Sequence, residues 1–270
     1  MSLDLTSAVA VLTGAGSGIG RATAHALARR GARVVVTDID GDRAAAVAAE
    51  LGELGALGGL GVGLRCDVCS IDDLSAARDV ALSRFGRVDL VMNNVGVLAV
   101  GAVEDIPLEA WQRIVDVNLL GIVRSNLVFL PGLLAQGSGH VVNTASTAGL
   151  LPYGHDRLPY TATKHAVVGL SEALAVYLRP RGIGVSCLCP AGVATNIVEQ
   201  ITFYGTPQPM RAPDFPIVEA AAVGELVAAA VEDDRFLVLT APEVADELRE
   251  RGADLDAYLA RLTTTEVGEP

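Results

Sequence analysis

The sequence predicts an α/β protein built on one doubly wound, seven-stranded parallel sheet with helices on both faces. Short runs rich in Val and Ile alternate with longer Ala-rich amphipathic segments, a pattern typical of βαβ units. A glycine-rich turn joins the first of these runs to the first amphipathic segment. Hydrophobic residues make up 51% of the 270 residues, which is ample for a sheet buried on both faces.

The elements follow in strict alternation along the chain. The predicted strands are Val9–Leu12, Arg33–Thr37, Val62–Cys66, Val88–Met92, His140–Thr144, Gly184–Leu188 and Phe236–Leu239. The predicted helices are Ile19–Arg30, Asp42–Leu54, Ile71–Phe85, Leu108–Leu134, Pro159–Leu178, Ile217–Glu232 and Pro242–Leu262. No repeat or linker divides the chain, so we expect a single domain over Met1–Pro270, ending in a loose tail at Thr263–Pro270.

Charge and composition exclude several classes of partner. The formal net charge is −12, which argues against nucleic acid and against an anionic membrane surface. No apolar run is expected to be long enough to cross a bilayer. The N-terminal segment Met1–Asp4 has no basic region followed by an apolar core, so the cytoplasm is the expected location.

The four cysteines form a C-x-x-C pair, Cys66 and Cys69, and a C-x-C pair, Cys187 and Cys189. Joining the two pairs would make a zinc site or a disulfide. We favour the alternative of free thiols in or beside strands, because free cysteine is among the most frequently buried residue types. No metal site is predicted.

The glycine-rich turn Thr13–Gly20 has the spacing G-x-x-x-G-x-G and lies between the first strand and the first helix. Its glycines allow a sharp turn and close approach of the backbone to a pyrophosphate, and the helix N-terminus offers unpaired N–H groups. The position at the start of a βαβ unit is the context that a Rossmann-like dinucleotide site needs. The alternative is a glycine-rich turn without a ligand.

Asp38 follows the second strand, where a carboxylate can accept both ribose hydroxyls of an adenosine and repel a 2′-phosphate. Ser17 and Ile39 occupy the obvious places for a phosphate-binding cation, and neither is basic. Asp38 could instead cap the next helix, but Asp40 and Asp42 are better placed to do so. We therefore expect NAD rather than NADP.

Tyr160 and Lys164 are one helical turn apart in the helix that Pro159 opens. An adjacent ammonium and the helix N-terminus both favour the phenolate, so this tyrosine can exchange a proton with an alcohol or a ketone. Lys164 is the only lysine among the 20 basic residues of the chain. That exception supports a need for a compact ammonium at this position. The alternative is that the position of the single lysine is due to chance.

Because these motifs occur together, the chain resembles the classical short-chain dehydrogenase/reductase family from about Leu5 to Val231. The segments that carry the resemblance stand in the family's order: Thr13–Gly20, Asp67, Asn93–Gly96, Asn118, Ser146, Tyr160 with Lys164, and Pro190–Thr195. Three departures from the usual pattern are Ala191 after Pro190, Val95 within Asn93–Gly96, and a charged helix beginning at Ala241–Glu243.

The resemblance implies a role for each matched residue. Tyr160 is the expected general acid/base, Lys164 binds the nicotinamide ribose, Ser146 holds the reacting oxygen, and Asn118 holds a water that relays protons to Lys164. Ser146 could alternatively be a cap, and Asn118 could make only a local backbone bond. The expected cofactor-binding residues are Gly14, Ser17, Gly18, Ile19, Gly20, Asp38, Asp67, Val68, Asn94, Gly96, Tyr160, Lys164, Pro190, Val193 and Thr195.

The segment Asn196–Pro216 falls where the family has a substrate lid, and it carries Phe203, Tyr204, Met210 and Phe215. An apolar lid favours an apolar or bulky secondary alcohol or ketone, unless these side chains only pack the loop. The family also implies a homodimer or homotetramer. The alternatives are a non-catalytic dinucleotide sensor on the same fold, or a different reaction such as epimerisation or dehydration.

Overall fold

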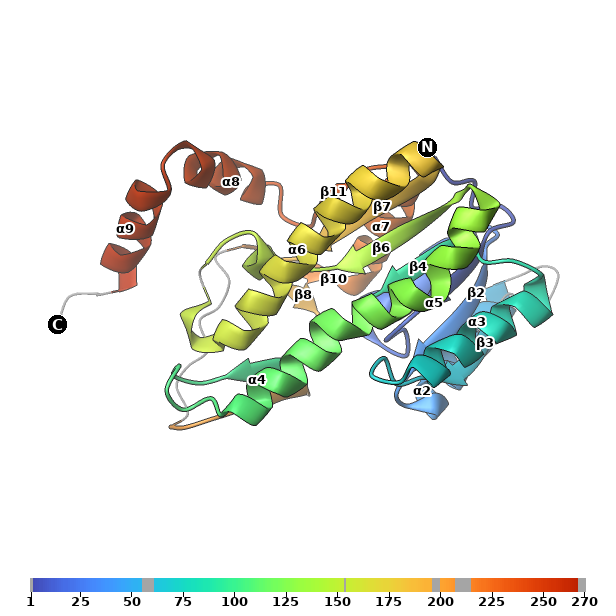
Figure 1. The fold of residues 1–270 in the computed structure, drawn as a ribbon, viewed down its shortest axis with the longest axis horizontal. Helices are drawn as coiled ribbons and strands as arrows, with labels where there is room; N and C mark the ends of the chain where they lie inside the picture. Colours follow the sequence, from blue (N-terminus) through green and yellow to red (C-terminus); the bar gives the residue numbers. More distant parts are fainter. Residues whose placement is uncertain (1, 55–60, 153, 196–199, 207–214, 267–270) are drawn as a thin grey trace.

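Figure 1 shows a twisted central sheet between two layers of helices. The computed structural model describes residues 2–54, 61–152, 154–195, 200–206 and 215–266. All seven strands of the central sheet are parallel, in the order β11-β7-β6-β4-β1-β2-β3, so the predicted fold class is confirmed. The strands are β1 (Val9–Leu12), β2 (Arg33–Asp38), β3 (Gly61–Arg65), β4 (Leu90–Asn93), β6 (Gly139–Thr144), β7 (Ile183–Cys189) and β11 (Leu237–Leu239).

The two helical layers follow from the alternation of side chains along each strand. In β1, Ala10 and Leu12 pack in one cluster, and Val9 and Val11 pack in a second cluster on the opposite face. The first cluster is covered by α1 (Gly18–Arg29), α2 (Gly41–Leu54) and α7 (Ala220–Glu232). The second is covered by α3 (Ile71–Phe85), α5 (Gly121–Gln136) and α6 (Leu158–Leu178). Both faces are therefore apolar, which explains the unbroken hydrophobic runs in the sequence.

The long helix expected over Leu108–Leu134 is interrupted. It consists of α4 (Leu108–Val115), a π-helical turn at Asp116–Leu120, and α5. By length and composition the stretch Leu108–Gln136 could cross a membrane, contrary to the expectation that no apolar run could do so. Part of its apolar surface belongs to the core, because Val128, Phe129 and Leu133 are buried against the sheet, while Leu127 is exposed.

Four short strands, which were not predicted, form two small parallel sheets outside the central one. β5 (Leu98–Val100) pairs with β9 (Ile201–Phe203), and β8 (Val193–Ala194) pairs with β10 (Val218–Glu219). Each pair joins segments that are far apart in the sequence, so neither has a local signal. The first pair ties part of the expected substrate lid to the chain that follows β4. Residues 196–199 and 207–214 of that lid, including Met210, lie outside the described residues.

The predicted helix Pro242–Leu262 is two helices, α8 (Val244–Ala253) and α9 (Leu255–Glu266). Asp254 separates them with an extended backbone, φ −156° and ψ 99°, and its side chain accepts the Ala257 N–H at the start of α9. Figure 1 shows the pair standing away from the sheet. Helix α9 continues through the first residues of the expected loose tail.

His140 lies in β6 and is fully buried. Its Nε2 is 2.9 Å from Ser186 Oγ, whose own hydrogen is donated to the Arg235 carbonyl, so Nε2 must carry the ring hydrogen. No described residue hydrogen-bonds to Nδ1. Burial lowers the pKa of His140 to about 4, against a smaller opposing effect of Asp234. Because the pKa in the folded state lies below that of an unfolded histidine, acid destabilises the fold.

This stabilisation is complete above about pH 6.5 and is lost as the pH falls toward 4, by at most about 3 kcal/mol. When the pH is lowered from 7 to 4.5, the unfolding free energy of both proteins should fall. We expect this fall to be about 2–3 kcal/mol smaller in His140→Gln than in the wild type. Urea unfolding at both pH values measures the difference, and carboxylate titration is common to both proteins. Equal losses in the two proteins would contradict the burial argument.

Candidate active site

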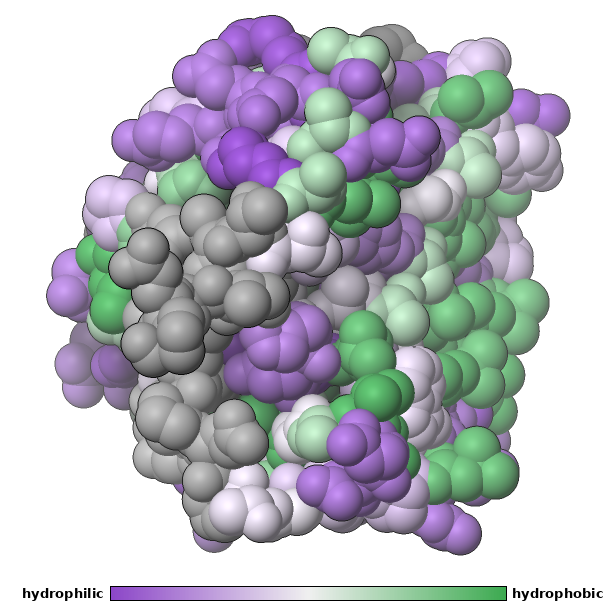
Figure 2. Space-filling view, turned by 90° about the vertical axis from the view of Figure 1, so that its left-hand side faces the viewer, coloured by the Kyte–Doolittle hydropathy of each residue, from purple (hydrophilic) through white to green (hydrophobic). Residues whose placement is uncertain are grey.

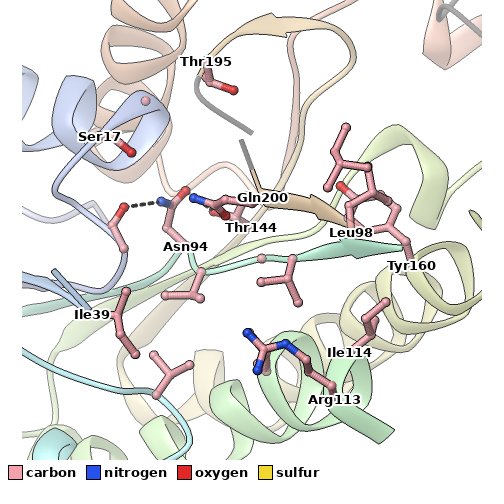
Figure 3. A pocket seen from close by; sticks show the side chains of 18 of the residues that line it. Ser17, Ile39, Asn94, Leu98, Arg113, Ile114, Thr144, Tyr160, Thr195 and Gln200 are labelled. Atoms are coloured by element: carbon pink, nitrogen blue, oxygen red, sulfur yellow. Dashed lines mark hydrogen bonds between the residues drawn. The ribbon is translucent and has the colours of Figure 1, made fainter. Parts of the chain in front are cut away.

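A pocket opens at the carboxyl ends of the strands, where β1 lies between β2 and β4 and the strand order reverses. In doubly wound sheets this is the point at which ligands bind. The pocket has a volume of about 690 Å³ and reaches from Asp38 and Ile39 at one end to Tyr160 and Tyr204 at the other. Figure 3 shows Ile39 and Tyr160 at opposite sides of this space.

The glycine-rich turn forms the wall beside α1. Gly14 and Gly18 have positive φ values of 60° and 52°, which favour glycine. A Cβ at Gly20 would lie 2.4 Å from the Gly14 carbonyl oxygen, so only glycine allows α1 to begin so close to the turn. The Ser17 side chain does not cap the described helix, which leaves the N–H groups of its first turn without a side-chain acceptor. This wall can therefore hold an anion.

Asp38 lies at the end of β2, and its carboxylate is held in place by two backbone groups. Oδ2 accepts the Gly16 N–H at 3.0 Å and Oδ1 accepts the Asp40 N–H at 3.1 Å. The cap of α2 is Asp40, which accepts the Asp42 and Arg43 N–H groups. Asp38 is thus available to a ligand through its remaining lone pairs. Arg43 also lines this end of the pocket, a cation that the sequence analysis overlooked.

Lys164 is buried beneath the opposite end of the pocket and is only 2% exposed. Its Nζ donates to the Thr144 carbonyl at 2.8 Å and lies 5.5 Å from the centre of the Tyr160 ring. Burial lowers the pKa of Lys164 to about 8. Both residues come from α6, where their spacing puts them on one face. Gly96 leaves room for the ammonium, since a Cβ there would lie 3.3 Å from Nζ.

Ser146 and Asn118 adjoin the pocket without lining it. Ser146 follows β6 and its Oγ accepts the Ala148 N–H, so this side chain does cap a short 3₁₀ turn. Asn118 lies in the π-helical turn and is fully buried. Its Oδ1 accepts the Val97 N–H and its Nδ2 donates to the Val97 carbonyl, so the side chain clamps the residue before β5.

Most of the expected cofactor-binding residues meet at this one pocket. Those that line it are Gly14, Ser17, Gly18, Ile19, Asp38, Asp67, Val68, Asn94, Gly96, Tyr160, Lys164, Pro190 and Thr195. Gly20 and Val193 do not. The Asn94 amide is engaged within the protein, because Nδ2 donates to the Gly14 carbonyl and Oδ1 accepts from Thr144 Oγ1. Asn94 therefore joins the glycine-rich turn to β6.

The end of the pocket near Tyr160 is mainly apolar. Leu98 and Ile114 lie toward Tyr160 in Figure 3, and the other side chains of β5, α4 and the lid that line the pocket are Ala99, Ala110, Arg113, Gln200, Ile201, Thr202 and Tyr204. Tyr204 packs with Ala99, Ile106, Ala110 and Ile114. Of the other expected lid aromatics, Phe203 is exposed and Phe215 packs against the core near α8. Sequence reasoning missed the α4 residues, although their spacing marks one helix face.

Comparison with known proteins gives a consistent result. The short chain dehydrogenase family model matches residues 8–203. Cyclohexanol dehydrogenase of Acinetobacter sp. (strain SE19) is 36% identical over 248 residues, covering 91% of this chain and 96% of that protein. 1-Deoxy-11-beta-hydroxypentalenate dehydrogenase of Streptomyces exfoliatus is 34% identical, covering 94% of this chain and 90% of that protein.

Solved structures of short-chain dehydrogenases are also similar to this chain. A short chain dehydrogenase/reductase from Burkholderia phymatum in complex with NAD superposes with a TM-score of 0.83 at 34% identity, covering 94% of this chain and 96% of that one. The 3-ketoacyl-(acyl-carrier-protein) reductase from Brucella melitensis complexed with NADH has a TM-score of 0.76 at 28% identity, covering 87% and 97%.

Proposed function

The chain belongs to the short-chain dehydrogenase family, and on that premise we propose that it is an NAD-dependent oxidoreductase that interconverts a secondary alcohol and a ketone with Tyr160 as general acid/base. One observation carries the proposal: the glycine-rich turn, Asp38 and the Tyr160–Lys164 pair all face one pocket at the switch point of the sheet. A pure dinucleotide sensor has no need of the last pair.

The pocket fits a dinucleotide on two structural grounds. The uncapped first turn of α1 beside Gly14 and Gly18 suits the pyrophosphate, and Asp38 suits the adenosine ribose. Asp67, Val68 and Asn94 would lie along the adenosine, while Thr195, which lines the pocket as Val193 does not, would hold the carboxamide. When bound, NAD supplies the hydride acceptor at C4 of its nicotinamide.

The chemistry of the chain's own residues is proton transfer. During oxidation the Tyr160 phenolate takes the hydroxyl proton of the alcohol, favoured by the Lys164 ammonium. Ser146 Oγ accepts the Ala148 N–H and keeps its own hydrogen to donate to the reacting oxygen. A Cβ at Gly96 would lie 3.3 Å from Lys164 Nζ and 3.9 Å from Asn118 Oδ1. A water in the space that this glycine leaves would connect Lys164 to Asn118 and carry the proton outward.

The substrate proposed is an apolar or bulky alcohol or ketone. Leu98, Ile114 and Tyr204 line the end of the pocket beside Tyr160. The relatives named cyclohexanol dehydrogenase and hydroxypentalenate dehydrogenase point in the same direction.

We further propose a cytoplasmic homodimer or homotetramer. Leu127 on α5 and Val176 on α6 are 63% and 79% exposed. In Figure 2 apolar surface gathers along the right-hand side, the face that carries α5 and α6 in Figure 1. A second copy would bury these side chains.

Asp38 should decide the choice of cofactor. We expect Asp38→Asn to weaken NADH binding about tenfold or more, because an amide cannot accept two ribose hydroxyls as a carboxylate does. The same change should strengthen NADPH binding, since the repulsion of the 2′-phosphate is removed. The single amide oxygen of Asn can still accept the Gly16 N–H, which keeps the glycine-rich turn in place, although the Asp40 N–H then loses its acceptor. Fluorescence titration with both cofactors measures the two dissociation constants.

Asp42→Asn is the matched control, since it removes one nearby exposed carboxylate and should change neither dissociation constant. Tighter binding of NADPH than of NADH by the wild type would rule out the NAD assignment. NADH formation from a panel of secondary alcohols, cyclohexanol included, then tests the reaction itself. Tight NAD binding without turnover of any alcohol would favour the sensor instead.

A further inference from the structure

Two arginines line the pocket without a part in the chemistry proposed above, and one of them, Arg43, pairs with Asp40 at the Asp38 end. Arg113 lies on α4 and lines the pocket on the same helix face as Ala110, Ile114 and Val117. Figure 3 shows its side chain reaching from α4 into the space between Ile39 and Tyr160, beside Ile114. The side chain is exposed, so it meets the solvent at the mouth of the pocket rather than the core.

Arg113 differs from most other arginines of this acidic protein. Thirteen of the 17 other described arginines have a carboxylate partner, as Arg29 does in Glu225 and Arg124 in Asp116. Among the described residues no carboxylate or other hydrogen-bond acceptor pairs with Arg113, although the chain has 32 acidic residues against 20 basic ones. A guanidinium left without a partner at the wall of a pocket is suited to an anionic ligand.

The charges around the pocket indicate whether the anion that pairs with Arg113 belongs to the substrate or to the cofactor. The described carboxylates that line it, Asp38, Asp40 and Asp67, belong to the adenosine end. The pyrophosphate is expected at the N-terminus of α1, and Figure 3 shows Ser17 and Arg113 on opposite sides of the pocket. The neighbours of Arg113 on its helix face, Ala110 and Ile114, pack with Tyr204 at the substrate end. The geometry therefore favours an anion on the substrate over a phosphate of the cofactor.

From this arrangement we infer that the substrate is amphipathic: an apolar body whose hydroxyl or keto carbon lies at Tyr160 and whose carboxylate, remote from that carbon, pairs with Arg113. The inference rests on the proposed oxidoreductase function and narrows its substrate class. The apolar wall of Leu98, Ile114 and Tyr204 holds the body, and Arg113 selects its charged end. Because Arg113 is exposed, the attraction is screened and the selectivity is modest.

The test compares two alcohols of one shape. 4-Hydroxycyclohexane-1-carboxylate and its carboxamide are oxidised with NAD, and the ratio of their kcat/KM values is measured. We expect Arg113→Leu to lower the carboxylate-to-carboxamide ratio about 10-fold. In the wild type this ratio should also fall as NaCl is raised, which a merely structural role would not cause. Arg84→Leu removes another exposed arginine, on α3 and away from the pocket, and should leave the ratio unchanged.

A binding measurement separates this inference from the catalytic proposal. Calorimetry follows cyclohexanecarboxylate and cyclohexanecarboxamide binding to the protein–NADH complex. Carboxylate binding that weakens in Arg113→Leu supports the inference even if no alcohol is oxidised, in which case only the catalytic proposal fails. The inference is overturned if neither the ratio nor carboxylate binding depends on Arg113. It is equally overturned if Arg113→Leu weakens NADH binding itself and affects both alcohols alike, since Arg113 would then serve the cofactor.

Discussion

Replacing Tyr160 with phenylalanine should lower kcat for alcohol oxidation by about 10²–10⁴-fold. The change removes only the phenolic oxygen, so the helix, the neighbouring Lys164 and the shape of the pocket are kept. Without that oxygen the base proposed for the hydroxyl proton is missing. Steady-state NADH formation from cyclohexanol at about pH 8 to 9 measures the loss.

The control is cofactor binding, which Tyr160→Phe should alter little, because the glycine-rich turn and Asp38 supply most of the contacts expected for NAD. Fluorescence titration of the variant with NADH would establish this. If Tyr160→Phe turned over cyclohexanol at the wild-type rate, another residue would have to be the base and the mechanism proposed here would be wrong.

Lys164→Met should be nearly as damaging, with kcat/KM lowered by at least about 100-fold and NAD binding weakened as well. Methionine has a similar length but supplies neither the charge that favours the phenolate nor a donor for the nicotinamide ribose. It would also leave the Thr144 carbonyl, which Lys164 Nζ contacts at 2.8 Å, without that donor. Kinetics and NADH titration on the same preparation separate the two losses.

Lys164→Arg tests the proposal more strictly than Lys164→Met, because it keeps the positive charge and changes only the shape of the cation. We expect it to remain inactive, since a planar guanidinium does not fit the small space between the Thr144 carbonyl and Gly96. The exposed swap Arg29→Lys on α1 serves as the control for exchanging the two cations. Wild-type turnover by Lys164→Arg would show that a compact ammonium is not required.

The central sheet could be predicted because its determinants are local. Strands buried on both faces need continuous apolar runs, and all seven were recognised from theirs, with ends that differ by at most two residues. Tyr160 and Lys164 could likewise be paired from helical spacing alone, since residues four apart share a face. The cap at Asp40 followed from its place just before α2.

What the sequence did not reveal depends on contacts between distant segments. The β5–β9 pair forms only when Leu98 and Ile201 are brought together by the rest of the fold. The π-helical turn around Asn118 coincides with a side-chain clamp on Val97, which no helical pattern predicts. Arg113 went unnoticed for a related reason: an arginine on an amphipathic helix is usually solvated, and only the pocket distinguishes this one.

The β5–β9 pair also bears on how such proteins diverge. Its hydrogen bonds belong to a two-stranded sheet separate from the central one, so changes in the exposed residues Thr202 and Phe203 remove no hydrogen bond of the seven-stranded sheet. The proposed substrate end of the pocket is thereby partly separated from the strands that end at the proposed dinucleotide site. We expect mutations of the exposed residues Thr202 and Phe203 to change selectivity at less cost to folding than mutations of the buried strand Leu98–Val100, so the lid strand is the better target for a library aimed at new alcohols.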